Sequence, residues 1–391
     1  MRPVVLIFIA HYLPGFKIGG PLRSIANLID HLSGEFDFFV FTSDRDLGDV
    51  RPYPDVIADC WTQVGGAKVY YASPKMKTLS GIAKVLKRTP HDLLYINSFF
   101  SFQNSMLPVL ALRHVRRSSV PVVIAPRGEF SRGALALKAW KKRPYTAIAK
   151  MSGLLRGLMW QASTEYEAED IRAAVGPTAK KIAIARNLAT RLPVVPPDHS
   201  PRALGEPLRL VFLSRISPKK NLDFALRVLA RVRKPVNFRI YGPPEDLAYL
   251  NECKVLVEAL AAHITVEWHD AVAPECVSTV MAQHDLFFFP TKGENFGHVI
   301  AEALGAGTPV LISDTTPWRG LAVEGVGNDF PLADADAFAS RIEELVELSP
   351  QEALNLRARV SKYARSLQDR DESVESHRNL FHQSLAGPAS H

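Results

Sequence analysis

The stretch TKGENFGHVIAEALGAGTPVLISD, residues 291–314, contains a loop, a helix-like run rich in small residues and the start of an apolar run. It ends in one strand-like segment, PVLISD (309–314), and follows another, DLFFFPT (285–291). Two apolar runs joined by a helix are typical of a β-α-β unit, in which the strands are parallel. We expect the helix to begin near Phe296 or Gly297, with its small residues lying close against the sheet.

The same alternation runs along the chain, and continuous Val/Ile/Leu runs between amphipathic segments predict parallel sheets covered on both faces. Predicted strands are 4–10, 38–43, 93–99, 122–126, 159–164, 208–216, 237–242, 264–268, 285–291 and 309–314. Predicted helices include PLRSIANLIDHL (21–32) and MLPVLALRHVRR (106–117). The sequence therefore predicts two doubly wound α/β domains, with a ligand site in the crevice at the carboxyl ends of their strands.

A domain boundary is indicated by RLPVVPPDHSPRALGEP, which is rich in proline and lacks apolar periodicity. A chain of 391 residues is long enough for two domains that each bury a core. We expect a first domain over 1–190, a linker over 191–207 and a second domain over 208–366. A C-terminal helix over 367–391 could cross back to the first domain.

Composition is that of a soluble globular protein, with 47% apolar and 22% charged residues. The cysteines Cys60, Cys253 and Cys276 show no metal-like or redox-like spacing, which favours reduced thiols and a cytoplasmic location. The apolar N-terminal run Val4–Ala10 is short and no cleavage site follows it, so we expect a buried first strand rather than a signal peptide. No apolar run is long enough to span a bilayer.

Charge is unevenly distributed along the chain. Residues 1–200 carry 27 Lys+Arg against 15 Asp+Glu, whereas the remainder carries 20 against 25. A basic half suggests a nucleic acid, a membrane surface or a phosphorylated ligand as a partner. Nucleic acid is the weakest of the three, because the aromatic residues of this half lie mostly in apolar strand runs.

Two glutamates stand out in the opening stretch. The start of the predicted helix offers backbone N–H groups and a partial positive charge that suit a phosphate. Glu294 lies in the loop before this helix and Glu302 lies about two turns along it, so both carboxylates could accept hydrogen bonds from hydroxyl groups. The spacing alone is a weak pattern, and a surface helix with two solvated glutamates remains an alternative.

Basic and glycine-rich segments follow two other predicted strands. LSRISPKKN places Arg215 and Lys220 at the carboxyl end of a strand, where fixed cations could neutralise a diphosphate. The neighbouring Lys219 is expected to lie in a solvated turn. Gly19 and Gly20 follow the first strand and precede a helix, which would permit close approach of the backbone to a phosphate.

In this order, on two α/β halves, these segments resemble the retaining glycosyltransferases of family 4, which have the GT-B fold of two Rossmann-like domains facing across a cleft. The resemblance covers nearly the whole chain and is most specific over 208–318, in GENFGHVIAEALGAGTPVLIS and LSRISPKKN. It implies that Arg215 and Lys220 hold a donor diphosphate, that Glu294 binds the donor sugar and that Glu302 binds the ribose. Further donor-binding residues implied by the resemblance are Gly19, Gly20, Asp270, Ala271, Phe296, Gly297, His298 and Val299.

The resemblance also implies a mechanism. The substrates would be a nucleotide-sugar donor and a glycan or polyprenyl-linked acceptor, as in the synthesis of bacterial surface polysaccharides. Neither a cofactor nor a metal is expected, because the cations would stabilise the leaving group. The acidic pair Asp334 and Asp336 has the D-x-D spacing of a metal-binding pair, but it falls at a late helix start and not in a plausible metal position. Where many members carry an acceptor-side histidine, this chain has Asn97 and Arg127. His11 follows the first strand, where it could reach the cleft or be a core or loop histidine. A nucleotide-sugar 2-epimerase and a non-catalytic nucleotide-sugar-binding protein are the alternatives.

A basic segment in the first half could contact a membrane. No acidic residue occurs from Phe130 to Thr164, and a helix drawn at 100° per residue would separate an apolar face from a basic one. The apolar face is Ile148, Met151, Leu154, Leu155, Leu158 and Met159; the basic face is Lys142, Arg143, Lys150 and Arg156. We expect either peripheral binding to the anionic inner leaflet or packing of the apolar face into the core.

Overall fold

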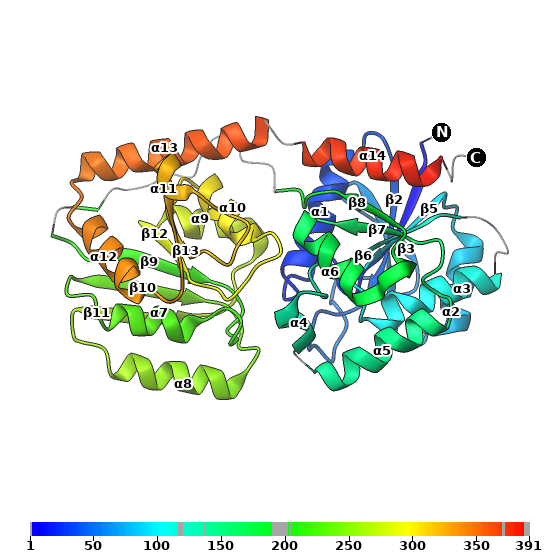
Figure 1. Ribbon diagram of the computed structural model, residues 1–391, viewed down its shortest axis with the longest axis horizontal. Coiled ribbons are helices and arrows are strands. Elements are labelled where there is room, and N and C mark those ends of the chain that lie inside the picture. Colours follow the sequence, from blue (N-terminus) through cyan, green and yellow to red (C-terminus); the bar gives the residue numbers. More distant parts are fainter. Residues whose placement is uncertain are drawn as a thin grey trace. The chain divides into compact units, whose positions relative to one another are not determined.

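The structure is a computed structural model that describes residues 2–115, 120–136, 138–189, 202–203, 205–369 and 372–386. The chain divides into two compact units (Figure 1). Unit 1 comprises Met1–Leu188 together with Glu372–His391, and unit 2 comprises Ala189–Asp371. Each unit contains a mainly parallel sheet with helices on both faces, which confirms the predicted α/β class. Most of the predicted linker, 191–207, lies outside the described residues.

The sheet of unit 1 has eight strands in the order β3-β4-β2-β1-β5-β6-β7-β8. All neighbours are parallel except the hairpin of β3 and β4. Their bounds are β1 Val4–Phe8, β2 Asp37–Ser43, β3 Trp61–Val64, β4 Ala67–Ala72, β5 Leu93–Asn97, β6 Val122–Ala125, β7 Met159–Ala162 and β8 Lys181–Ile184. Every residue of the central strand β5 is buried, as its continuous apolar sequence predicts.

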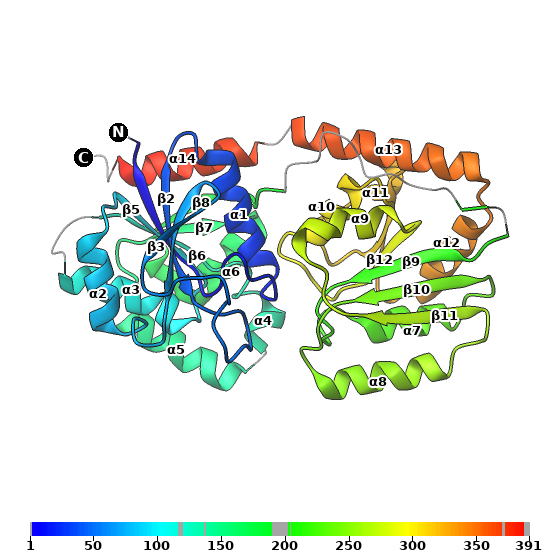
Figure 2. The same cartoon turned by 180° about the vertical axis from the view of Figure 1, so that it is seen from behind.

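Helices cover both faces of this sheet (Figure 2). They are α1 Gly20–Leu32, α2 Leu79–Arg88, α3 Met106–Val115, α4 Arg132–Ala136, α5 Ala139–Met151, α6 Glu165–Val175 and α14 Ser373–Leu385, with 3₁₀ turns at Phe102–Asn104 and Gly176–Thr178. Alternate residues of β1 belong to opposite cores: Leu6 packs with α2, α3 and α6, whereas Val5 packs with α1 and α14. The C-terminal helix α14 is thus part of unit 1, where Phe381 packs edge-on against Phe36 with ring centroids 5.3 Å apart.

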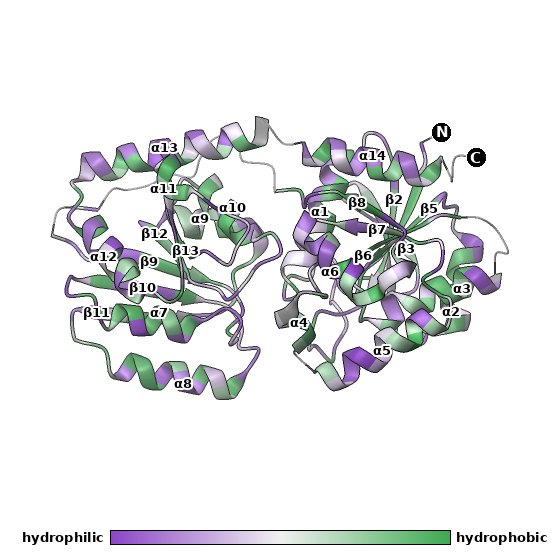
Figure 3. Cartoon of the chain, viewed as in Figure 1, coloured by the Kyte–Doolittle hydropathy of each residue, from purple (hydrophilic) through white to green (hydrophobic). Residues whose placement is uncertain are grey.

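Unit 2 has six parallel strands in the order β11-β10-β9-β12-β13-β14. The strands are β9 Leu208–Leu213, β10 Val236–Tyr241, β11 Ile264–His269, β12 Leu286–Phe289, β13 Val310–Ser313 and β14 Gly327–Phe330. The helices are α7 Leu222–Leu229, α8 Leu247–Glu258, α9 Val277–Ala282, α10 His298–Gly305, α11 Leu321–Glu324, α12 Ala335–Val346 and α13 Pro350–Asp369, with a 3₁₀ turn at Pro274–Cys276. Hydrophobic and hydrophilic residues alternate along α8 and α13, as expected for helices packed on one side (Figure 3).

The predicted helices over 21–32 and 106–117 correspond to α1 and α3, although 116–119 lie outside the described residues. Helix α10 begins at His298, one residue past the expected start. The sequence does not predict strands β3, β4, β8 and β14. Three of these, β3, β8 and β14, lie at sheet edges, where a strand can form without a continuous apolar run.

The amphipathic helix drawn over residues 142–159 is wrong beyond Met151. Helix α5 ends there, and Gly153 and Gly157 adopt positive φ angles of 72° and 76° in the turns that follow. Such angles are readily accessible to glycine and break the helical path. Strand β7 then begins at Met159, so the two ends of the drawn helix belong to different elements.

Candidate functional site

In unit 2, two loops at the carboxyl ends of β9 and β12 are bound to each other. The side-chain amide of Asn221 donates to the carbonyl of Pro290 at 2.8 Å, and Asn221 itself has a φ of 61°. The backbone N–H of Lys292 and the hydroxyl of Thr291 both donate to the carbonyl of Lys219, at 2.9 and 3.2 Å. The loop that carries the predicted cations is therefore fixed against the loop that carries the first glutamate.

Lys220 and Glu294 meet between these loops. The ammonium Nζ of Lys220 lies 2.5 Å from Oε1 of Glu294, and the hydroxyl of Thr291 donates to the same oxygen at 3.2 Å. The Lys220 ammonium also lies 5.3 Å from the centroid of the Phe289 ring. Both charged side chains are only 13% exposed, so the ion pair is largely desolvated and holds Glu294 in one place.

Arg215, in the same loop as Lys220, has a different environment. Its guanidinium lies 2.9 Å from the carboxylate of Glu245, in the loop after β10, and the two side chains are 33% and 47% exposed. An ion pair in water of this kind is weak and easily exchanged. Lys219 is exposed, in the kind of turn that the sequence suggests.

The position of this loop depends on Gly242 at the end of β10. A Cβ atom at Gly242 would lie 1.9 Å from the carbonyl oxygen of Ser214, and its φ of 142° is also unfavourable for other residues. The close approach brings the end of β10 against the residue that precedes Arg215.

Helix α10 begins beside Glu294. Its N-cap, Gly297, has a φ of 82°, and a Cβ there would lie 2.9 Å from the side chain of Ile300. The indole of Trp318 donates to the carbonyl of Phe296 at 2.7 Å, which fixes the chain just before the helix. The first N–H groups of a helix have no partner within the helix and carry partial positive charge, so this end suits an anion. Of the other residues predicted here, His298 is buried, and Val299 and Glu302 are half-buried.

The ends of β10 and β11 form an aromatic and charged platform. The rings of Tyr241 and His269 are stacked, with centroids 4.5 Å apart and planes inclined by 12°. The Glu267 carboxylate accepts from Arg239 at 2.8 Å and lies 3.3 Å from His269; the Arg239 hydrogen bond is the main cause that lowers the pKa of Glu267. Asp270, which follows this platform, is exposed and the next residue, Ala271, is half-buried.

The predicted acceptor-side residues of unit 1 contact each other. The guanidinium of Arg127 donates to the side-chain oxygen of Asn97 at 2.8 and 3.1 Å, to the hydroxyl of Tyr95 at 2.7 Å and to the side chain of Asn187. Arg127 itself is half-buried and has a φ of 56°. Its Asn97 partner is buried, and the amide nitrogen Nδ2 of that residue has no hydrogen-bond partner among the described residues.

This network continues into the core of unit 1. The Tyr95 hydroxyl donates to Gln161, and Nε2 of Gln161 contacts the carbonyl of Ala185 at 2.8 Å and Nε2 of His377 at 3.1 Å. Nδ1 of His377 lies 3.0 Å from the carbonyl of Ser373, which is consistent with a neutral ring that donates there and accepts from Gln161. Burial lowers the pKa of His377 to about 3.

Two carboxylates that the sequence analysis did not identify, the half-buried Glu129 and the buried Glu167, hold the loops around Arg127. Glu129 accepts from the hydroxyl of Ser98 at 2.7 Å and from the backbone N–H groups of Phe99 and Phe100 at 2.5 and 3.1 Å. Burial raises the pKa of Glu129, against the effect of these donors. Glu167 accepts from Gly128 and Ser163.

A sequence signal exists for one of these two carboxylates. The run STEYE places a threonine three residues before Glu167, the spacing of a helix-capping box, and Thr164 accepts from the Glu167 N–H at 3.1 Å.

The remaining predicted residues also lie in unit 1. Gly19 is the N-cap of α1 with a φ of 72°, and the helix begins at Gly20 with a proline in its first turn. A Cβ at Gly19 would meet nothing within 4 Å, so its surroundings are open. Nδ1 of His11 lies 2.9 Å from the carbonyl of Arg45.

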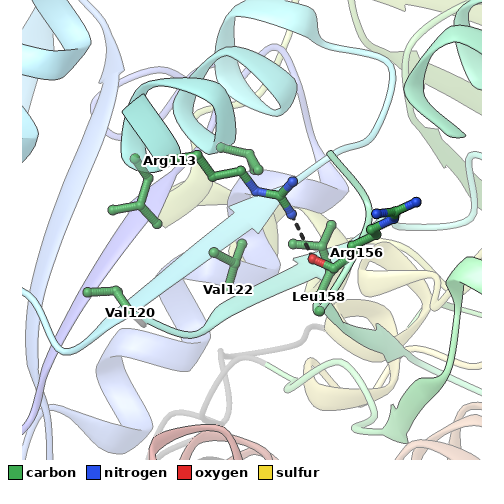
Figure 4. A pocket seen from close by; sticks show the side chains of 8 residues that line it. Arg113, Val120, Val122, Arg156 and Leu158 are labelled. Carbon is green, nitrogen blue, oxygen red and sulfur yellow. Dashed lines mark hydrogen bonds between the residues drawn. The ribbon is translucent and has the colours of Figure 1, made fainter. Parts of the chain in front are cut away.

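A small cavity of about 150 Å³ lies elsewhere in unit 1, lined by Val109, Leu112, Arg113, Val120, Val122, Arg156, Gly157 and Leu158 (Figure 4). The guanidinium of Arg113 donates to the backbone carbonyls of Gly153 and Arg156, each at 2.7 Å. These contacts fasten the end of α3 to the turns after α5, so Arg113 has a structural role here.

The described residues offer neither a metal site nor a membrane-spanning helix. They contain no group of three or more His, Cys, Asp or Glu side chains that could hold a metal ion. Within the same residues, no helix is both long and apolar enough to cross a membrane.

The chain has the GT-B fold, since solved structures of glycosyltransferases match it over nearly its whole length. The sucrose-phosphate synthase of Thermosynechococcus elongatus has a TM-score of 0.73 at 18% identity and covers 99% of this chain and 100% of its own. The Anabaena protein HepE in complex with UDP-glucose has a TM-score of 0.64 at 16% identity, covering 97% and 98%. At these identities the likeness shows the fold.

Residues 198–367, which lie in unit 2, match the family model of glycosyl transferases group 1, as the resemblance over 208–318 predicts. A D-inositol 3-phosphate glycosyltransferase of Xylanimonas cellulosilytica is 27% identical over 201 residues, which are 47% of this chain and 48% of that relative. The chain thus spans about half the length of this curated relative.

Proposed function

We propose that this protein is a glycosyltransferase of the family 4 type, which moves a sugar from a nucleotide-sugar to a glycan or lipid-linked acceptor with retention of configuration and without a metal. The observation that carries the proposal is the desolvated pair of Lys220 and Glu294, 2.5 Å apart, beside the start of α10. It combines a cation for a diphosphate with a carboxylate for sugar hydroxyls at one point of the fold.

The leaving diphosphate would be stabilised by charges that are already in place. Lys220 is fixed by its loop, and Arg215 can exchange its exposed partner Glu245 for a phosphate. The first N–H groups of α10 add partial positive charge. Preorganised groups of this kind favour the transition state because they need little rearrangement as charge develops.

The other residues of the site would each contact a different part of the donor. Glu294 would accept hydrogen bonds from the sugar, and Glu302, on α10 itself, from the ribose. The backbone at Asp270 and Ala271, after the Tyr241–His269 stack, would contact the nucleobase. Retention of configuration requires attack on the face from which the diphosphate leaves, so the departing phosphate would accept the proton of the acceptor hydroxyl.

On the acceptor side, we assign Arg127 and Asn97 to sugar recognition in unit 1, with Gly19 and Gly20 at the start of α1 approaching the diphosphate. The Asn97 amide nitrogen without a partner supports this assignment, because a buried donor is costly unless a ligand or water accepts from it. The acceptor class that we favour is a polyprenyl-linked glycan at the inner face of the plasma membrane, in the synthesis of a bacterial surface polysaccharide.

A thermal-shift screen of nucleoside diphosphates and their sugars tests the donor assignment. A ligand at about 100 times its Kd should stabilise the unit that binds it by about 2.7 kcal/mol. The matched donor is then incubated with lipid-linked glycans and, separately, alone. Transfer with a retained anomeric configuration supports the proposal, whereas an epimerised sugar from donor alone would identify an epimerase. Binding without either reaction would identify a non-catalytic nucleotide-sugar-binding protein.

A further inference from the structure

The outward side of α5 is apolar. The side chains of Trp140, Ile148 and Met151 are 74%, 67% and 87% exposed. At 100° per residue, these three fall with Pro144 and Ala147, both also exposed, within an arc of about 100°. The inward side is held by other residues: Ala149 is buried, and the hydroxyl of Tyr145 donates to the carbonyl of Phe99 at 3.0 Å. The stripe is therefore additional to the face that packs into the core.

Cations flank this stripe on both sides. Lys141 lies on one edge, and Arg143 and Lys150 lie on the other; all three are exposed. The ammonium of Lys141 also lies 4.7 Å from the centroid of the Trp140 indole. An apolar stripe with cations on both edges is the pattern of a helix that lies in the interface of a bilayer.

The elements next to α5 continue the positive charge. Arg113 ties α3 to the turns after α5, and α3 packs on α2. Helices α2 and α3 carry a surface groove of about 560 Å³, lined by Leu79, Ser80, Ala83, Lys84, Lys87, Arg88 and His114. From Ser73 to Thr164 the sequence has 16 Lys+Arg against two acidic residues, Asp92 and Glu129, and the carboxylate of the second accepts hydrogen bonds within the loop network described above.

We propose that α5 docks this protein on an anionic lipid surface, with Trp140, Ile148 and Met151 entering the headgroup–acyl boundary and the flanking cations contacting lipid phosphates. A nucleic acid would use the cations but leave the apolar stripe in water. A second copy of the chain, packed stripe to stripe, would bring like charges together along both edges. A lipid surface of negative charge satisfies both features at once.

This inference deepens the proposed function by naming the surface that presents a lipid-linked acceptor. It rests on the proposed function only for the reason why the protein would dock on a membrane. Docking can be measured without any sugar donor. If the protein does not bind vesicles but transfers sugar to a soluble acceptor, only the docking surface is rejected. If it binds vesicles but transfers no sugar, only the enzymatic proposal is rejected.

The experiment is co-sedimentation of the full chain with vesicles of phosphatidylcholine, with and without phosphatidylglycerol. We expect binding only with the anionic lipid, weakening as salt is raised. The triple variant Trp140→Ser, Ile148→Ser, Met151→Ser and the triple variant Lys141→Gln, Arg143→Gln, Lys150→Gln should each lower the partition coefficient at least about tenfold. Because all six side chains are exposed, the variants should retain the unfolding temperature of the parent protein.

Matched controls lie in unit 2. The exposed apolar residues Val255 and Val323 changed to serine, and the exposed cations Arg233, Lys254 and Lys362 changed to glutamine, should leave binding within about twofold. Insertion is read from quenching of tryptophan fluorescence by lipids brominated on their acyl chains, which Trp140→Phe should abolish without abolishing sedimentation.

Several outcomes would overturn the inference: no sedimentation with anionic vesicles at low salt, equal losses in the control variants, or quenching that persists in Trp140→Phe. A dimer in lipid-free solution that the serine triple variant dissociates would instead assign the stripe to a second copy.

Discussion

The two units place their polar groups differently. In unit 2 the candidate donor site consists of charged side chains on two loops, and one of its cations, Arg215, faces an exchangeable partner in water. In unit 1 the polar residues Tyr95, Asn97 and Gln161 are buried and joined through Arg127. The first arrangement leaves charges available for a ligand, whereas the second uses its hydrogen bonds to hold strands, loops and α14 together. Substitutions in the unit 2 loops should therefore act mainly on transfer, whereas substitutions in the unit 1 network should also lower stability.

The largest effect is expected at the exposed cation. Replacement of Arg215 by alanine should lower the rate of transfer about a hundredfold, or about 2.7 kcal/mol, because a leaving diphosphate loses one of its fixed positive charges. Steady-state kinetics with the matched donor measures this, and the thermal unfolding of Arg215→Ala should equal that of the parent. The exposed Arg233→Ala in the same unit is the control. Near-normal turnover in folded Arg215→Ala would reject the diphosphate assignment.

In unit 1 the matching change should act on stability. Arg127→Leu would leave Tyr95, Asn97 and Asn187 without the donor they share. Since each buried polar group left unpaired costs about 1–3 kcal/mol, unfolding of unit 1 should be easier by at least about 2 kcal/mol. Urea unfolding followed by circular dichroism measures it, with the exposed Arg186→Leu as control. An unchanged midpoint would show that the network adds little and would leave ligand binding as the role of Arg127.

Acid should weaken unit 1 through His377. Burial lowers the pKa of this histidine from 6.5 to about 3, so the unfolded chain binds a proton that the folded chain does not. Its contribution to stability is therefore complete above pH 6.5 and is lost as the pH falls from 6.5 towards 3. Between pH 7 and pH 5 the loss should be about 2 kcal/mol.

The comparison that isolates this effect is between the parent and His377→Gln, each unfolded by urea at several pH values. The variant should show a shallower fall in unfolding free energy between pH 7 and pH 5. The buried His284 of unit 2, whose burial lowers its pKa to about 4, should still titrate in both proteins. Equal slopes in the two proteins would contradict the assignment to His377.

Substitution of Glu294 or Glu302 should change the kinetic constants by a smaller factor than Arg215→Ala. Glu302→Gln should raise the KM for donor about tenfold with little change in kcat, because ribose contacts are similar in the ground and transition states. Glu294→Gln should mainly lower kcat, since this carboxylate would lie beside developing positive charge on the sugar. Initial rates over a range of donor concentrations separate the two, and the opposite pattern would mean that their roles are exchanged.

The contrast between the units also explains what could be predicted from sequence. The candidate donor-site residues of unit 2 lie in short segments next to strand ends, so strand prediction and local composition could single out Lys220 and Glu294, although their ion pair was not predicted. In unit 1 the network combines residues 95, 97, 127, 161, 187 and 377, which only the folded sheet and α14 bring into contact. Asn97 and Arg127 were identified singly, but their mutual hydrogen bonds have no local signal.

The error in α5 has the same origin. Periodicity correctly separates apolar from charged positions but does not show where a helix ends, and the glycines at 153 and 157 decide that. Leu155 and Leu158, drawn on one face with Ile148, belong to the core, while Ile148 itself faces outward. A pattern drawn over 142–159 thus combined two segments with opposite environments.

The smallest effect expected is at Glu245, the partner of Arg215. Half-exposed ion pairs of this kind contribute about 0–1 kcal/mol, so Glu245→Gln should tighten the binding of a nucleoside diphosphate by no more than about fivefold. The sign is the informative part, since a carboxylate that competes with phosphate for Arg215 must weaken binding. Isothermal titration at low and high salt measures it, because the gain should shrink as salt screens both interactions.

Arg215→Ala supplies the control for this last measurement. If Glu245 acts through the guanidinium, Glu245→Gln should have no effect in an Arg215→Ala background, and the double-mutant cycle should show the whole gain as coupling between the two residues. A weaker affinity in Glu245→Gln would mean that the carboxylate holds Arg215 in position for the ligand. In that case Arg215, like the polar groups of unit 1, would depend on its neighbours for its place, and the contrast between the units would be one of exposure alone.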